Sequence, residues 1–160
     1  MPAKKTKELA EGGLAPDFEL PNQDGKKIKL SQFKGKKNVV LYFYPKDLTP
    51  GCTTEACNFS EQLPRFSKAD TVILGVSLDN AASHQKFIAK HGLKFDLLSD
   101  LDKKVVNLYG VYGEKSMYGK KFMGINRTTF VIDKEGNLKK IFPKVKVEGH
   151  WEEVLQALKD

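Results

Sequence analysis

The feature that most constrains the fold is the almost continuous apolar run Asn38–Tyr44 (NVVLYFY), which Pro45 ends. A run of strand-forming residues without polar alternation is typical of a strand buried on both faces, and such strands belong to sheets covered by helices on both sides. A second run of the same kind, Thr71–Leu78, follows after a helical segment. The chain is therefore predicted to fold around a covered, mostly parallel sheet.

The first helix is predicted to begin directly after the loop that follows Tyr44. Thr49 is a suitable N-cap, and Pro50 suits the first helical position because its missing N–H is harmless there. An apolar stripe at helical spacing follows, made of Cys52, Ala56, Phe59, Leu63 and Phe66. Pro64 lies inside the stripe, so we expect the helix to be kinked or split near residue 60.

The rest of the chain continues the alternation of helices and strands. Further helices are expected at 81–90 with His91-Gly92 as C-cap, from an Asp102 cap to Tyr109, and at 150–158; further strands are expected at 95–98, 127–133 and 138–142. The last two strands should form an antiparallel hairpin, whereas 110–124 shows no clear period and is expected to be a loop. This order predicts an α/β fold with a mixed, mostly parallel central sheet flanked by helices.

The length of 160 residues suits one domain, which we place at 12–160 after a flexible N-terminal tail at 1–11. No run of 18 apolar residues exists, so no membrane association is expected. The N-terminus lacks the apolar segment of a secretory signal peptide. The chain contains only two cysteines, which indicates a reducing compartment, and we expect a cytoplasmic protein.

The net charge of +7 invites the hypothesis of a nucleic-acid-binding domain. Of the 27 basic residues, however, only Arg65 and Arg127 are arginine, and the lysines are scattered in short pairs. The chain contains no recognisable nucleic-acid-binding signature. A solvated lysine-rich surface is the better interpretation, and no nucleic-acid partner is expected.

Cys52 is predicted to lie in the first turn of its helix. Unpartnered N–H groups and the helix dipole stabilise negative charge there, which favours a reactive thiolate. Thr49 lies one turn earlier, and its hydroxyl can donate to a thiolate or accept from an incoming O–H group. The alternative is a small buried hydrophobic residue, a common role for free cysteine.

Cys57 lies five residues after Cys52. In one straight helix their Cα atoms would be about 8.6 Å apart, whereas a disulfide requires less than about 7 Å. A permanent disulfide is therefore not expected, but a transient one can form if the first turns unwind. The three histidines are scattered without ligand spacing, so no metal site is expected.

Arg127 is the second unusual residue, because it opens an apolar strand in a chain that otherwise uses lysine. A guanidinium stays charged when buried and presents a rigid fork to an anion. Placed over a thiolate, it would stabilise the thiolate and orient a polar oxygen substrate. A surface arginine at the start of a strand is the alternative.

The stretch YFYPKDLTPGCTTEAC, with Pro45, Thr49 and Cys52 in the spacing P-x-x-x-T-x-x-C, resembles the active-site signature of peroxiredoxins. The position of Cys57 resembles the peroxiredoxin Q subfamily, also called bacterioferritin comigratory protein. Further similar stretches are GLAPDF near the start and FMGINRTTF around Arg127. The resemblance covers roughly residues 12–158.

The resemblance implies a thioredoxin-like fold with peroxiredoxin additions and a thiol-dependent peroxidase acting in antioxidant defence. It makes Cys52 the peroxidatic and Cys57 the resolving cysteine, Thr49 and Arg127 the residues that hold the thiolate and peroxide, and Pro45 a shield of the site. It further implies hydrogen peroxide and organic hydroperoxides as substrates, an intramolecular disulfide recycled by thioredoxin or a similar dithiol, no bound cofactor, and a monomer. A redox-sensing or chaperone-like interaction protein that uses the same cysteines without turnover is the alternative function.

Overall fold

The computed structural model of the protein describes residues 9–160, apart from the side chain of Met117. Its central sheet has five strands in the order β5-β4-β3-β8-β9. The middle strand β3 (Asn38–Phe43) is parallel to β4 (Thr71–Ser77), and β4 is parallel to β5 (Asp96–Ser99). On the other side, β8 (Thr128–Ile132) and β9 (Leu138–Phe142) are antiparallel. The predicted mixed sheet and its closing hairpin are confirmed.

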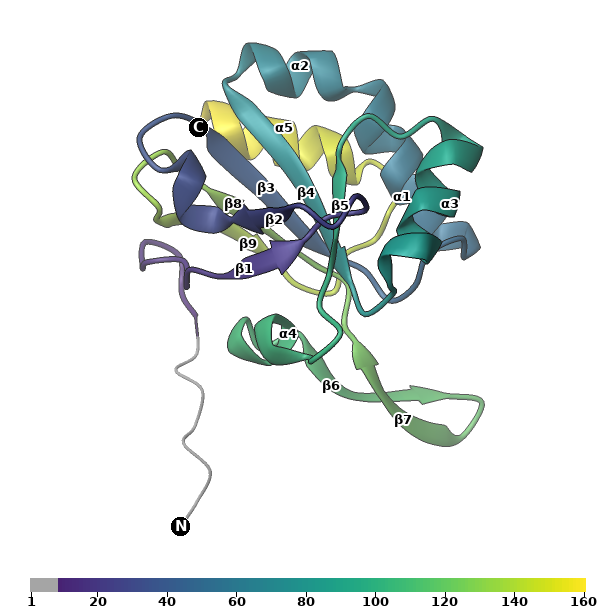
Figure 1. Ribbon diagram of the computed structural model, residues 1–160. Coiled ribbons are helices and arrows are strands. Elements are labelled where there is room, and N and C mark those ends of the chain that lie inside the picture. The colour runs from purple at the N-terminus through teal and green to yellow at the C-terminus, as the bar shows by residue number, and fades with distance from the viewer. Residues whose placement is uncertain (1–8) are drawn as a thin grey trace.

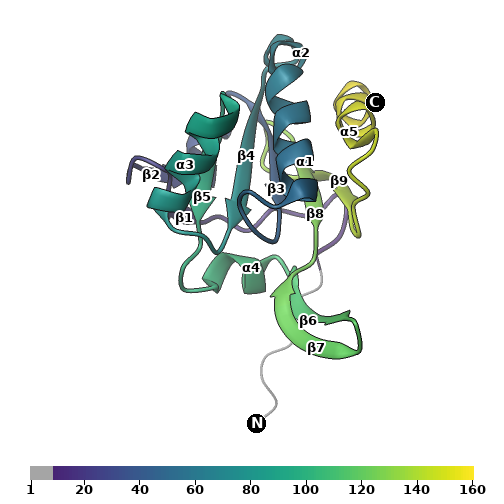
Figure 2. The same ribbon diagram turned by 90° about the vertical axis from the view of Figure 1, so that its right-hand side faces the viewer.

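Helices and short strands cover both faces of this sheet (Figures 1 and 2). The helices are α1 (Pro50–Glu61), α2 (Leu63–Lys68), α3 (Ala81–His91), α4 (Lys104–Leu108) and α5 (His150–Lys159). Residues of α1, α2, α3 and α5 pack on one face. The other face is covered by α4 and by an N-terminal hairpin of β1 (Glu19–Pro21) and β2 (Lys27–Lys29), followed by the 3₁₀ turn Leu30–Phe33.

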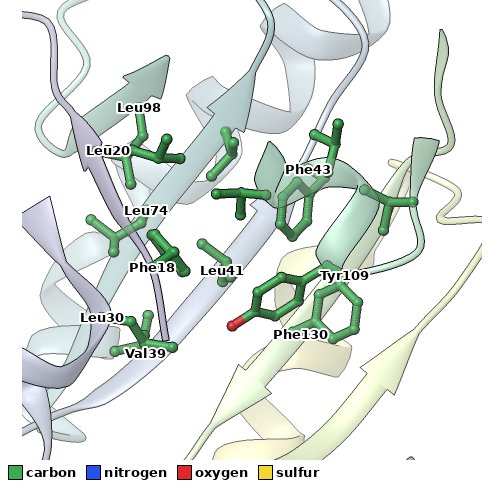
Figure 3. Packing of buried hydrophobic residues seen from close by; sticks show 14 of the residues in the cluster. Phe18, Leu20, Leu30, Val39, Leu41, Phe43, Leu74, Leu98, Tyr109 and Phe130 are labelled. Carbon is green, nitrogen blue, oxygen red and sulfur yellow. The ribbon is translucent and has the colours of Figure 1, made fainter. Parts of the chain in front are cut away.

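The central strand β3 is buried on both faces, as its apolar run predicts. Val39, Leu41 and Phe43 point into the cluster with β1, β2 and α4, which Figure 3 shows from close by. Val40 and Tyr42 point the opposite way, into the cluster with α1, α3 and α5. Strand geometry sends successive side chains to opposite faces, so an uninterrupted apolar run is what a doubly covered strand requires.

The first helical segment is split as Pro64 predicts. The helix α1 begins at Pro50 with Thr49 as N-cap residue and ends at Glu61, and α2 starts again at Leu63. The predicted cap of α3 is also confirmed, because Gly92 ends it in the left-handed conformation with φ +63°.

The prediction of a loop at 110–124 is wrong. Residues Tyr112–Met117 (β6) and Lys120–Ile125 (β7) form an antiparallel hairpin that projects from the body (Figure 2). Its turn residues Tyr118 and Gly119 both have positive φ, at +53° and +76°. This geometry suits a tight hairpin and is usually marked by Asn-Gly or Asp-Gly. Because a tyrosine occupies the first turn position, the sequence lacks the usual signal of a hairpin here.

The prediction of Asp102 as the cap of α4 is also wrong. The helix starts at Lys104, after Lys103 in a left-handed conformation. The buried Asp100 satisfies the helix start instead, because its Oδ2 accepts from the N–H of Val106 at 2.8 Å. Asp100, two residues before the predicted Asp102, therefore takes the role of the capping residue.

The N-terminal hairpin of β1 and β2 had no counterpart among the predicted elements. Its strands have three residues each, too few for a periodic pattern. Of the predicted tail, residues 1–8 lie outside the described residues. Leu9 packs against the core, and the Glu11 carboxylate accepts from the N–H of Ile141 at 3.0 Å. Among residues 9–160, no helix has the length and apolar character to cross a bilayer.

Replacing Gly75 by alanine should destabilise the sheet. A Cβ atom at this position of β4 would lie 2.9 Å from Leu97 Cδ2 and from the ring of Tyr42. Overpacking of this kind costs about 1–3 kcal/mol in the free energy of unfolding. Urea denaturation measures it, with Gly113→Ala as control, since the nearest atom to that Cβ would lie at 3.6 Å. Equal effects of the two substitutions would contradict the packing argument.

Candidate active site

The predicted site lies beyond the carboxyl end of β3, where the chain passes through a short loop into α1. Pro45 is half-buried in this loop, and Leu48 turns the chain with a positive φ of +64°. Thr49 occupies the N-cap position, so Cys52 falls in the first turn of α1 as predicted. The sulfur therefore lies beside N–H groups that begin a helix of 12 residues.

The Thr49 hydroxyl does not cap this helix. It donates to the carbonyl oxygen of Lys46 at 2.9 Å, and among the described residues no side chain caps the first turn of α1. The first N–H groups of the helix are thereby left for other acceptors. An anionic sulfur or a polar oxygen of a substrate suits them best.

Arg127 and Cys52, which are 75 residues apart, are in direct contact. The guanidinium donates from Nη2 to the Cys52 sulfur at 3.2 Å. The sheet register explains the contact: Thr128 of β8 pairs with Phe43 of β3, so the residue before β8 lies beside the loop that follows β3. This geometry favours an arginine placed over the thiol and not the alternative of a surface arginine.

Glu55, one turn after Cys52, completes this arrangement. Arg127 donates from Nη1 to Glu55 Oε1 at 2.6 Å, and the glutamate side chain is 1% exposed. Burial raises the pKa of Glu55 to about 7, although the neighbouring Arg127 acts to lower it. Its second oxygen, Oε2, has no hydrogen-bond partner among the described residues. The glutamate thus fixes the guanidinium, and its carboxyl group is only partly ionised near pH 7.

Charge from two sides keeps the guanidinium protonated. Burial acts to lower the pKa of Arg127, but the charges of Glu55 and Cys52 outweigh burial and raise it. Lys115 of β6 adds a second cation nearby: its Nζ donates to the carbonyl oxygen of Ile125 at 2.8 Å. Burial and the charge of Arg127 lower the pKa of Lys115, while Cys52 acts in the opposite direction.

Cys57 lies in the same unbroken helix as Cys52, and both are free thiols. Cys52 is buried at 1% exposure, whereas Cys57 is half-buried. Burial and the charge of Glu61 raise the pKa of Cys57, so this thiol stays protonated in the folded helix. Both cysteines thus lie in one helix, as the sequence predicts.

The sequence reasoning missed Glu55 and Lys115. A signal for Glu55 was present, because it is a charged residue beside Cys52, Ala56 and Phe59 on the apolar face of the helix. A carboxylate in such a position needs a buried cation as partner. The sequence offered no signal for Lys115, because its position near Arg127 depends on the β6–β7 hairpin, which was expected to be a loop.

Comparison with known proteins identifies the family. Residues 12–141 match the model of the AhpC/TSA family. A putative peroxiredoxin Bcp of Helicobacter pylori is 53% identical over 150 residues, which cover 94% of this chain and 98% of the relative. The chain belongs to the AhpC/TSA family. The predicted enzyme class is confirmed as well: the protein is a peroxiredoxin, a peroxidase of the oxidoreductase class.

Further relatives support the subfamily that the sequence resembles. Peroxiredoxin Bcp of Bacillus subtilis is 52% identical over 149 residues, 93% of this chain and 94% of that one. A structure of Xanthomonas campestris peroxiredoxin Q has a TM-score of 0.84 at 46% identity and covers 89% of both chains. A mutant Xylella fastidiosa PrxQ reaches a TM-score of 0.90 at 38% identity, covering 96% and 97%. These peroxiredoxin neighbours confirm the thioredoxin-like α/β fold.

Gly51→Ala should slow the reaction of Cys52 with peroxide. A Cβ atom at Gly51 would lie 3.3 Å from Arg127 Nη2, so the guanidinium must shift by a few tenths of an ångström from its place beside the sulfur. Misplacement by a fraction of an ångström to about 1 Å costs roughly ten- to a hundredfold in rate. Stopped-flow measurement of thiol loss gives the rate, and Thr54→Ala on the exposed side of α1 is the control. An unchanged rate in Gly51→Ala would show that the contact is not needed.

Glu55→Gln should stabilise the protein increasingly as the pH rises from about 4.5 to 7. The pKa of Glu55 is raised from 4.5 to about 7 in the fold, so the stability that its bound proton provides is present below 4.5 and is lost as the pH passes through 7. The neutral glutamine avoids this loss, which amounts to about 3 kcal/mol at most. Urea denaturation of both proteins across this range measures the difference. A difference that does not change with pH would contradict the raised pKa.

Proposed function

We propose that the protein reduces hydrogen peroxide and organic hydroperoxides with Cys52 as the attacking sulfur. The observation that carries the proposal is the 3.2 Å contact between Arg127 Nη2 and the Cys52 sulfur at the start of α1. A thiolate is the nucleophilic form of cysteine, and both the guanidinium and the helix start stabilise it. Solved structures of the Xanthomonas campestris relative concern its alkyl peroxide reduction activity, which supports organic hydroperoxides as substrates.

In the first step, the Cys52 thiolate attacks the terminal oxygen of the hydroperoxide. The S–O bond forms as the O–O bond breaks, and the departing oxygen takes up a proton and leaves as water or an alcohol. Cys52 is oxidised to a sulfenic acid. Arg127 and the free N–H groups of the first turn are placed to stabilise charge on the two oxygens, and the Thr49 hydroxyl can accept from the O–H of the peroxide. Pro45 shields the sulfur from solvent in this proposal.

In the second step, Cys57 condenses with the sulfenic acid. The sulfur of Cys57 displaces the sulfenic oxygen, which leaves as water, and a disulfide forms. Five residues of intact helix hold the two Cα atoms about 8.6 Å apart, so the start of α1 must unwind first. Thioredoxin or a similar dithiol then reduces the disulfide and is itself oxidised.

The remaining expectations belong to this proposal. No bound cofactor is required, because sulfur carries both electrons. We propose a monomer that acts in a reducing compartment, the cytoplasm, since the sequence contains only the two cysteines used in the cycle. An α/β domain of residues 12–160 contains every residue of the proposed site.

One equivalent of peroxide should remove two hydrogens from the reduced protein and link Cys52 to Cys57. Intact mass and peptide mapping measure both changes. Cys57→Ser should instead gain one oxygen at Cys52, and Cys52→Ser should remain unmodified. A disulfide between two chains would contradict the intramolecular route.

The peroxidase should also turn over in the presence of a thioredoxin system. Continued consumption of peroxide in the steady state, lost in Cys52→Ser, is the expected result. Consumption of a single equivalent by the wild-type protein would instead favour the redox sensor. A parallel assay with excess dithiothreitol separates this outcome from a mismatch between the protein and thioredoxin.

A further inference from the structure

The proposed reaction leaves unused a buried carboxylate–imidazole pair directly beside the active-site loop. His84 Nδ1 lies 2.6 Å from Asp47 Oδ2, and the two side chains are 0% and 1% exposed. The other ring nitrogen, Nε2, lies 3.1 Å from the carbonyl oxygen of Leu98. A carbonyl oxygen only accepts, so Nε2 carries a hydrogen, and Nδ1 shares a hydrogen bond with the Asp47 carboxyl group. The pair is closed off from solvent.

Asp47 is held by more than the imidazole. Tyr44 donates its hydroxyl to Oδ1 at 2.5 Å, and Ser83 donates its hydroxyl to Oδ2 at 2.9 Å. The backbone N–H of Asp47 donates to Asp79 Oδ2 at 2.8 Å. Fully satisfied buried networks of this kind are rigid. The network joins the end of β3, the start of α3 and the end of β5 to one residue of the active-site loop.

Beyond Asp47, the chain toward Cys52 is held much less firmly. Leu48 adopts the left-handed conformation, which is unfavourable for a residue with a Cβ atom, and its side chain is 41% exposed. Thr49 uses its hydroxyl on Lys46 within the loop, and no described side chain caps the first turn of α1. Strained backbone persists only when its surroundings fix it. Asp47 is the fixed point nearest to the strained residue.

We propose that Asp47 and His84 are positioning residues that set how readily the start of α1 unwinds. The inference rests on the proposed function, because it concerns the step between the Cys52 sulfenic acid and its disulfide with Cys57. We call the hydrogen bond between Asp47 and His84 the tether. With the tether intact, the loop holds Thr49 and the first turn in the form that reacts with peroxide. When the tether loosens, Leu48 leaves its strained conformation and the first turn opens.

The tether therefore decides between two fates of the sulfenic acid. Opening allows Cys57 to displace the oxygen as water and form the disulfide. In the closed form, a second hydroperoxide can transfer an oxygen atom to the same sulfur, which gives the irreversible sulfinic acid and releases water or an alcohol. Loosening the tether should speed the disulfide and protect against sulfinic acid, while slowing the first attack on peroxide only slightly.

Two substitutions of His84 distinguish the effect of losing the hydrogen bond to Asp47 from the effect of losing the imidazole ring. The amide nitrogen of asparagine takes the place of Nδ1, and that of glutamine takes the place of Nε2. His84→Asn therefore keeps a donor to Asp47 and loses the bond to Leu98, whereas His84→Gln keeps the bond to Leu98 and loses the tether. Both remove the ring. Ser83→Ala is a milder variant that removes one hydrogen bond to Asp47.

The experiment titrates each reduced variant with hydrogen peroxide and measures the ratio of disulfide to sulfinic acid by mass spectrometry. Loss of a hydrogen bond to a charged group predicts a rise of about tenfold in this ratio for His84→Gln. Ser83→Ala should give a smaller rise, and His84→Asn should remain within about twofold of wild type. Asp100→Asn removes a buried carboxylate that holds α4, and as control for general destabilisation it should leave the ratio unchanged.

Equal ratios in His84→Gln and His84→Asn would overturn the inference, as would a rise in Asp100→Asn as large as in His84→Gln. Hydrogen exchange of the amides in the first turn of α1 tests the reduced protein independently of the chemistry, and it should be faster in His84→Gln than in His84→Asn. If wild type forms no disulfide at all, the proposed function fails, and the exchange experiment still decides whether the pair holds the helix start. Exchange at equal rates in the two variants would refute it.

Discussion

The site depends on one guanidinium that is shared between a sulfur and a carboxylate. Arg127 donates to Cys52 at 3.2 Å and to Glu55 at 2.6 Å, and the two acceptors lie one turn apart on the same helix. Glu55 fixes one side of the fork, so the other side is directed at the sulfur without further support. Because burial raises the pKa of the glutamate to about 7, its carboxyl group is only partly ionised near pH 7 and offsets only part of the arginine's charge. The remainder acts on the sulfur, which is what a reactive thiol requires.

This contact in turn depends on the sheet. The antiparallel pairing of β8 with β3 places Thr128 opposite Phe43, so the residue before β8 meets the loop after β3. A register shift by one residue would turn the apolar side chains of β8 to the wrong faces, and both faces are buried. The two packed clusters that fix the register therefore also fix the distance between Arg127 and Cys52. Core packing and the proposed chemistry share one constraint, and Cys52 belongs to both.

Prediction from the sequence was most successful where a pattern is long or chemically unusual. The apolar run of β3, the split at Pro64 and the glycine that ends α3 each have a direct physical signal, and each is confirmed. The hairpin of β6 and β7 was missed because Tyr118 occupies a left-handed position that normally selects asparagine or aspartate. At α4, the carboxylate that satisfies the helix start is Asp100, outside the cap position from which local rules predict it.

The sequence by itself determined the covered strand, the helix that starts beside Cys52 and the five-residue separation from Cys57, because each follows from neighbouring residues and backbone geometry. It also provided the resemblance to peroxiredoxins. Only the tertiary structure decided that Glu55 and Lys115 belong to the site and that Asp47 is tied to His84, since these contacts join residues 10 to 72 positions apart. Local periodicity records which face of a helix is apolar, but the partner of a buried charge is chosen by the packing of the whole sheet.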